Sequence, residues 1–121
     1  MKTAVVIFAH GSPIESANES VRAVARAVAG GAGFDIVEPA FLEGGRPSLA
    51  EAVAGCAARG AGRVLIVPYF LTLGLHLQRD LPRMTAEIAA NCPRLRIDVA
   101  PPLDGHPALV EALRDRARDL G

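Results

Sequence analysis

Two histidines and one glutamate of this sequence have the residue types and spacing for metal chemistry. His10, Glu43 and His76 each follow a short apolar run, directly or after one loop. Glu43 lies as far after His10 along the chain as His76 lies after Glu43. Imidazole nitrogens bind divalent transition metals, and a carboxylate is a further ligand or a base. Brought together, the three side chains would form a site for a divalent metal and for proton transfer.

The segments that must position these residues alternate between two kinds. The apolar runs predict strands at residues 3–9, 34–41, 63–68 and 94–100. The amphipathic segments between them predict helices at residues 13–29, 47–57, 80–92 and 107–120. This βαβαβαβα order predicts one α/β domain over residues 1–121, a three-layer sandwich with a four-stranded parallel sheet. We expect the flavodoxin-like strand order 2-1-3-4.

That strand order would gather the three residues at one edge of the sheet. The first strand would lie between the second and the third, so the carboxyl ends of these three strands would be neighbours. In open α/β sheets, ligands bind outside the carboxyl ends of the strands. We therefore expect His10, Glu43 and His76 to converge on one site.

Each of these residues also has a purely structural interpretation. His10 could bond only to the start of the next helix, Glu43 could be a solvated loop carboxylate, and His76 could be a hydrogen-bonded histidine in an apolar loop. The remaining histidine, His106, directly precedes Pro107, which favours a role at the start of a helix. The functional interpretation therefore depends on the three residues lying together.

The segment after His10 has the pattern of a helix start. Ser12 is a good N-cap, Pro13 suits the first helical position, and Glu15 would complete an S-x-x-E capping box. On this helix, the residues expected to face the protein interior are Ala17, Val21, Val24, Ala25 and Val28.

The glycine run 30–33 follows this helix rather than a strand, so it is not a phosphate-binding loop. No Walker, G-x-G-x-x-G or G-x-S-x-G motif occurs in the sequence.

Composition excludes several classes of partner. Thirteen basic and thirteen acidic residues cancel, Trp is absent and aromatic residues make up 4%, which argues against a nucleic-acid partner. Cys56 and Cys92 lack C-x-x-C spacing and fall in helical patterns, so we expect buried, reduced thiols. No apolar run approaches the ~20 residues of a membrane span, and the run before His10 is too short for a signal peptide. We expect a cytoplasmic protein without a membrane partner.

Three blocks of the sequence resemble the small sirohydrochlorin chelatases, the cobaltochelatases and ferrochelatases of the ATP-independent class II group. The blocks are Ala9–Ser12, Ala40–Leu49 and Val67–Pro82, the last with the pattern Gly74-x-His76-x-x-x-Asp80-Leu81-Pro82. The resemblance implies insertion of a divalent metal, Co²⁺ first or else Fe²⁺ or Ni²⁺, into sirohydrochlorin during cobalamin or sirohaem synthesis. It implies no nucleotide or organic cofactor. His10, His76 and Glu43 match the residues that bind the metal and assist deprotonation.

The resemblance also implies how the macrocycle is held and how the chain assembles. Many family members have a basic residue where this chain has Pro13 or Leu75. The substrate carboxylates are therefore assigned to the helix start at Ser12 and to Arg46 and Arg79. Since related enzymes have two fused lobes of about this length, we expect a symmetric homodimer. The alternatives are a metal-delivery or storage protein of the same fold, and a flavodoxin-like binding domain.

Overall fold

The computed structural model describes residues 1–31 and 33–121 and has the predicted α/β architecture. The strands are β1 (Lys2–Ala9), β2 (Ile36–Phe41), β3 (Ala61–Pro68) and β4 (Arg96–Val99). The helices are α1 (Glu15–Gly31), α2 (Leu49–Ala58), α3 (Leu75–Asn91) and α4 (Pro107–Arg118). The four strands form one parallel sheet in the order β2-β1-β3-β4, which confirms the predicted 2-1-3-4 order.

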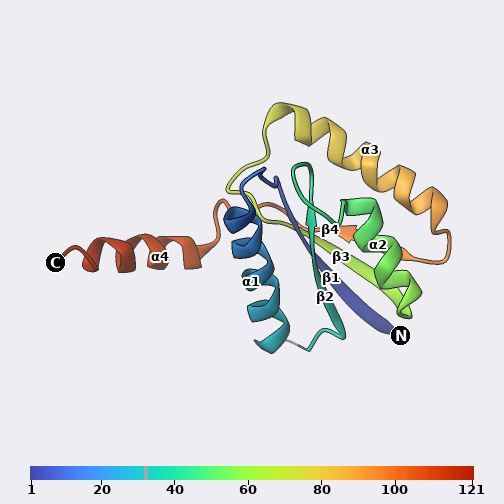
Figure 1. Cartoon of the computed structure of the whole chain (residues 1–121), viewed down its shortest axis with the longest axis horizontal. Coiled ribbons are helices and arrows are strands. Elements are labelled where there is room, and N and C mark those ends of the chain that lie inside the picture. The colour runs from blue at the N-terminus through green and yellow to red at the C-terminus, as the bar shows by residue number, and fades with distance from the viewer. Residues whose placement is uncertain (32) are drawn as a thin grey trace.

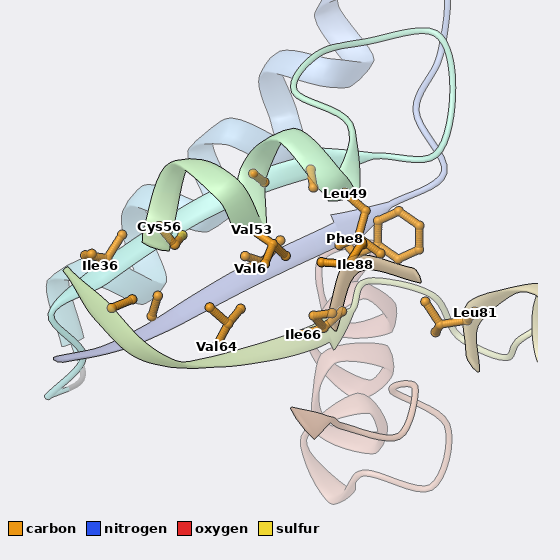
Figure 2. Packing of buried hydrophobic residues seen from close by; sticks show 14 of the residues in the cluster. Val6, Phe8, Ile36, Leu49, Val53, Cys56, Val64, Ile66, Leu81 and Ile88 are labelled. Carbon is orange, nitrogen blue, oxygen red and sulfur yellow. The ribbon is translucent and has the colours of Figure 1, made fainter. Parts of the chain in front are cut away.

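Helices cover both faces of the sheet, α1 on one and α2 with α3 on the other (Figure 1). Successive residues of β1 point to opposite faces, because side chains alternate along a strand. Val6 and Phe8 pack with α2 and α3 residues such as Val53 and Leu81 (Figure 2). On the other face, the residues that pack together are Val5, Ile7, Ala9, Val21, Ala25 and Phe41. The central strand is therefore buried on both sides, as expected for a parallel sheet.

The predicted capping box of the first helix is wrong. Helix α1 begins at Glu15, and the hydroxyl of Ser12 accepts a hydrogen bond from Ile14 N at 3.0 Å. The Glu15 carboxylate pairs with Arg22 at 2.6 Å instead of reaching back to Ser12. The buried side chain of Asn18 accepts the hydrogen bond from Ser12 N, so this amide is not available to the Glu15 carboxylate that a capping box requires.

A capping box does form at the start of α2. The hydroxyl of Ser48 accepts from Glu51 N at 3.2 Å, and the Glu51 carboxylate accepts from Ser48 N at 2.9 Å. Arg46 pairs with the same carboxylate. The Arg46 guanidinium and the Ser48 amide hold the pKa of Glu51 down, at about 2.

The third helix starts earlier than predicted. It begins at Leu75, after the extended residue Gly74, and Pro82 lies inside it. The predicted helix over residues 80–92 places Pro82 near the helix start, where proline is tolerated. The helix instead begins five residues earlier than predicted, about one and a half turns, and this moves His76 from a loop into the first helical turn.

The last helix is set apart from the rest of the molecule. Helix α4 projects away from the sheet on the same side as α1 (Figure 1), and none of its residues is buried. His106 caps it, because its Nδ1 accepts from Ala108 N at 3.0 Å, which confirms the predicted helix-start role.

Both cysteines are free; Cys56 is buried as expected, whereas Cys92 is only half-buried at the end of α3. Among the described residues, no helix has the length and apolar character that a membrane span needs.

Candidate active site

The loops after β1 and β2 run side by side and bring His10 next to Glu43. Parallel pairing continues beyond the strands: Leu42 N donates to Ala9 O at 2.9 Å, and Glu43 N donates to His10 O at 3.0 Å. The side chains follow the backbone, with His10 Nε2 3.6 Å from Glu43 Oε1. Both side chains are mostly exposed. The predicted meeting of these two residues is therefore a product of the sheet register.

Two glycines allow these loops to approach each other so closely. Gly11 has φ of +87°, and a Cβ there would lie 1.7 Å from the carbonyl oxygen of Glu43. Gly44 has φ of +70°, and a Cβ there would lie 2.7 Å from the carbonyl carbon of Ser12. Each loop therefore needs a glycine opposite the other loop, since any side chain would push His10 and Glu43 apart.

Asn18 is a buried residue whose side chain forms hydrogen bonds with the backbone of both loops. This residue of α1 is only 1% exposed. Its Oδ1 accepts from Ser12 N at 3.0 Å, and its Nδ2 donates to Ser12 O at 2.8 Å and to Gly44 O at 3.0 Å. Sequence reasoning missed this residue, although it stands three residues before Val21 on the helix face that packs on the sheet. Ala17, which was expected to point inward, is exposed.

The ring of His10 is oriented by its own backbone. His10 Nδ1 lies 3.1 Å from the carbonyl oxygen of Gly11. A carbonyl can only accept a hydrogen bond, so this contact places a ring hydrogen on Nδ1, and in the neutral imidazole the Nε2 lone pair then faces Glu43. A nitrogen lone pair and a carboxylate that face each other attract a cation between them. In metal sites, a carbonyl commonly orients a ligand histidine in this way.

His76 joins His10 at a shared cavity of about 340 Å³. His76 reaches it from the first turn of α3, whereas His10 reaches it from the end of β1. The cavity is lined by His10, Leu42, Phe70, Gly74, Leu75, His76, Leu77 and Asp80. Asp80 stands one helical turn after His76 and adds a carboxylate to the cavity lining. This residue belongs to the sequence motif, where no role was assigned to it.

The arrangement is an open one. Within the described residues, no three side chains of the His, Cys, Asp and Glu types lie close enough together to enclose a metal ion. His10, His76 and Asp80 instead line an accessible cavity, and Glu43 lies beside His10 outside the cavity lining. A divalent ion at such a place would keep coordination positions for a second molecule.

The three predicted substrate contacts lie outside this cavity lining. Arg46 lies in the loop before α2, 82% exposed, and is paired with Glu51. Arg79 is exposed on α3, between His76 and Asp80. At Ser12, the amide donates to Asn18 and the hydroxyl accepts from Ile14, so this helix start is already hydrogen-bonded within the chain. Of the predicted substrate contacts, Arg79 is the one closest along the chain to a cavity-lining residue.

Comparison with known sequences gives consistent matches. A sequence model described as CbiX matches residues 4–120. The chloroplastic sirohydrochlorin ferrochelatase of Arabidopsis thaliana is 32% identical over 112 residues, covering 93% of this chain and 50% of that protein. The sirohydrochlorin cobaltochelatase of Methanopyrus kandleri is 37% identical over 81 residues, covering 67% of this chain and 57% of that protein. The chain thus spans about half the length of these curated relatives.

Solved structures superpose on almost the entire chain. The putative cobalamin biosynthesis CbiX protein of Marinobacter aquaeolei has a TM-score of 0.85 at 27% identity, covering 97% of this chain and 95% of that chain. The structure of SirB from Bacillus subtilis with Fe³⁺ has a TM-score of 0.91 at 26% identity. It covers 100% of this chain and 48% of that chain. This chain therefore resembles a whole protein in one case and one half of a longer protein in the other.

Proposed function

Because this chain belongs to the CbiX family, we propose that it is a chelatase that inserts a divalent metal ion into sirohydrochlorin without a nucleotide. One observation carries the proposal: His10 and His76 line the same open cavity, and Glu43 lies 3.6 Å from His10 Nε2. The metal is a substrate of this reaction. Co²⁺ is the first candidate, with Fe²⁺ and Ni²⁺ next, since neutral imidazole suits all three ions. Relatives named as cobaltochelatases and ferrochelatases support this range.

The chemistry has two obstacles that these side chains address. The metal must exchange its waters for the macrocycle nitrogens, and two pyrrole N–H protons must leave. We assign the metal to His10 Nε2 and to His76, which release it as the macrocycle nitrogens replace them. We assign Glu43 to proton acceptance, or to a further ligand position, beside His10. The Gly11 carbonyl keeps hydrogen on Nδ1, so Nε2 stays available to the metal.

The macrocycle carries many carboxylates, and basic side chains near the cavity would bind them. Arg79 is our first choice because it lies on the same helix as His76. Arg46 is a second contact, which would require it to leave Glu51. The hydroxyl hydrogen of Ser12 is a third. Since Cys56 and Cys92 are free thiols, we place the reaction in the cytoplasm.

We infer that two copies act together. The cavity beside His10 and His76 is open on one side and is small for a planar tetrapyrrole. Relatives of about twice this length carry a second half in the same chain. A symmetric homodimer would supply that second half here.

Substitution of the two histidines tests the proposal. His10→Ala and His76→Ala should each lower the rate of Co²⁺ insertion, followed by the absorbance of the macrocycle, by about 100-fold. His106→Asn is the matched control, because His106 caps α4 away from the cavity and asparagine is also a good cap. Near-normal insertion by both alanine variants would refute the assignment.

The turnover number separates an enzyme from a delivery protein. With metal and sirohydrochlorin in excess, a chelatase forms many equivalents of product for each protein chain. Product that stops at one equivalent per chain would instead identify a metal-delivery protein that uses the same ligands. The competing ions Co²⁺, Fe²⁺ and Ni²⁺, offered together, would identify the preferred metal.

A further inference from the structure

The cavity that His10 and His76 share has an apolar wall. The apolar residues of its lining are Leu42, Phe70, Leu75 and Leu77. Leu42 and Phe70 are half-buried and pack against the core behind them. The ring of Phe70 is supported by that of Phe8, with the two centroids 6.0 Å apart. This wall is therefore held in place by the core, and it needs no ligand to form.

Leu75 is the one member of this wall whose side chain is mostly exposed, at 65%. It is the first residue of α3 and directly precedes His76. The loop before it is fixed, because the Gln78 side chain donates from Nε2 to Leu73 O at 2.9 Å. Ligand sites are typically lined by apolar side chains with a few polar groups among them. A fixed, exposed leucine that continues the apolar wall beside His76 has the character of a ligand contact.

Gly74 keeps the space next to Leu75 open. It is the N-cap residue of α3, and its φ of −64° is one that any residue can adopt. A Cβ at this position would meet nothing within 4 Å. Asn, Asp or Ser would cap the helix at least as well as glycine does. Neither the backbone conformation nor the packing of the described residues requires glycine here, so the missing side chain leaves room for something outside the chain.

The charged groups near the cavity offer little to an anion. The carboxylate of Asp80, in the cavity lining, pairs with Arg83 at 3.2 Å, and Arg46 pairs with Glu51. Within the described part of the chain, Arg79 forms no ion pair. One guanidinium of α3 is therefore free, whereas the macrocycle carries many carboxylates. Exposed ion pairs also contribute little to binding, so most of the affinity for the macrocycle must come from its ring.

We propose that Leu75 is a specificity-determining residue: with Phe70 and the open space at Gly74, it binds the face of the macrocycle, and the site recognises the ring rather than the number of its carboxylates. This inference rests on the proposed function and names the part of the substrate that is recognised. The cavity of about 340 Å³ is too small to enclose a tetrapyrrole, so the ring lies across its mouth. Most carboxylates then remain in water, and tetrapyrroles with fewer of them bind equally well.

A matched pair of porphyrins tests this specificity without any metal. Uroporphyrin I and coproporphyrin I have the same ring, and coproporphyrin carries half as many carboxylates. Their dissociation constants, measured by the change in porphyrin fluorescence, should agree within about threefold and should change little between about 50 and about 300 mM salt. Coproporphyrin binding that is weaker by more than about tenfold, or affinity that falls steeply with salt, would overturn the proposal.

Substitution of Leu75 tests whether this binding occurs at the proposed place. Leu75→Ala should weaken binding of both porphyrins by about tenfold, because less apolar surface is covered by the ring. Leu75→Met, which keeps an apolar side chain of similar size, should restore most of the affinity. Leu120→Ala is the matched control, since Leu120 is 92% exposed beyond the end of α4. Equal affinity of Leu75→Ala and the unchanged protein would contradict the assignment.

Substitution of Gly74 separates binding from folding. Gly74→Asn should leave the free energy of unfolding unchanged or slightly higher, because asparagine is a good N-cap. The same variant should bind both porphyrins about tenfold more weakly, because its side chain occupies the space that the ring needs. Full affinity in this variant would show that the ring does not lie at Gly74 and would refute the proposed placement.

Steady-state kinetics distinguish this inference from the chelatase proposal. Leu75→Ala should raise KM for sirohydrochlorin about tenfold while kcat and KM for Co²⁺ stay within about twofold. Normal metal insertion together with binding that depends on carboxylate number would refute ring recognition alone. Absence of insertion by the unchanged protein, with Leu75-dependent binding of both porphyrins, would refute the chelatase proposal and support the ring-binding site.

Discussion

The side chain of Asn18 forms a two-point clasp on the backbone of Ser12. Its Oδ1 accepts from Ser12 N at 3.0 Å, and its Nδ2 donates to Ser12 O at 2.8 Å. The same Nδ2 reaches Gly44 O at 3.0 Å, so one buried amide holds the loops that carry His10 and Glu43. The distance between those two side chains thus depends on a residue of α1 that touches neither of them.

Asn18→Ala should therefore cost both stability and activity. Three hydrogen bonds would be lost at a buried position, and the free energy of unfolding should fall by about 2–3 kcal/mol in urea titrations. Metal insertion should fall further than the loss of folded protein explains, because His10 and Glu43 would no longer be held together. Asn91→Ala is the control: its single hydrogen bond, to Glu87 O, is exposed, and the change should be below about 0.5 kcal/mol. Equal stability of the two variants would contradict the clasp.

Gly11→Ala should disrupt the loop contact. The new methyl group would meet the Glu43 carbonyl at a backbone with φ of +87°, so we expect a loss of about 3 kcal/mol or more in the free energy of unfolding. Gly55→Ala is the matched control, since a Cβ at this α2 position meets nothing within 4 Å. It should stabilise the protein by about 0.5–1 kcal/mol. A tolerated Gly11→Ala would show that the two loops do not need their close approach.

Asp80→Asn should weaken metal insertion without weakening the fold. The Asp80 carboxylate lines the cavity with both histidines and attracts a divalent cation there. Loss of this charge should lower kcat/KM for Co²⁺ by about tenfold, with the larger effect at low ionic strength. Glu87→Gln on the same helix removes one charge outside this cavity and should leave kcat/KM within about twofold. Identical rates for the two variants would remove Asp80 from the site.

The capping box of α2 predicts an acid-dependent contribution to stability. Ser48→Ala should lower the free energy of unfolding by about 1 kcal/mol at pH 7. The pKa of Glu51 is lowered from 4.5 to about 2, so the folded state favours its carboxylate. The contribution of Glu51 is then complete above pH 4.5 and is lost as the pH falls toward 2. Urea titrations of wild type and Glu51→Gln should differ at pH 6 and converge near pH 2; a constant difference would contradict the pKa shift.

Much of the fold follows from local patterns in the sequence. The apolar runs and the amphipathic segments were sufficient for the order of the elements and for the parallel sheet, whereas the strand order 2-1-3-4 was expected from the flavodoxin-like fold class. Errors came where a tertiary contact overrides a local signal. Ser12 and Glu15 have the spacing of a capping box, but Asn18 takes the Ser12 amide. Pro82 resembles a helix-start residue, but α3 continues through it.

For the candidate site too, some features could be predicted from the sequence and others only from the tertiary structure. The sequence by itself was enough to select His10, Glu43 and His76 as candidate site residues, because they follow neighbouring strands and parallel strands end at one edge. Only the tertiary structure decided how these groups are held. The clasp by Asn18, the facing glycines Gly11 and Gly44, and the direction of α4 depend on segments distant in sequence. Local propensity carries no information about such contacts, since they exist only after the loops have been packed together.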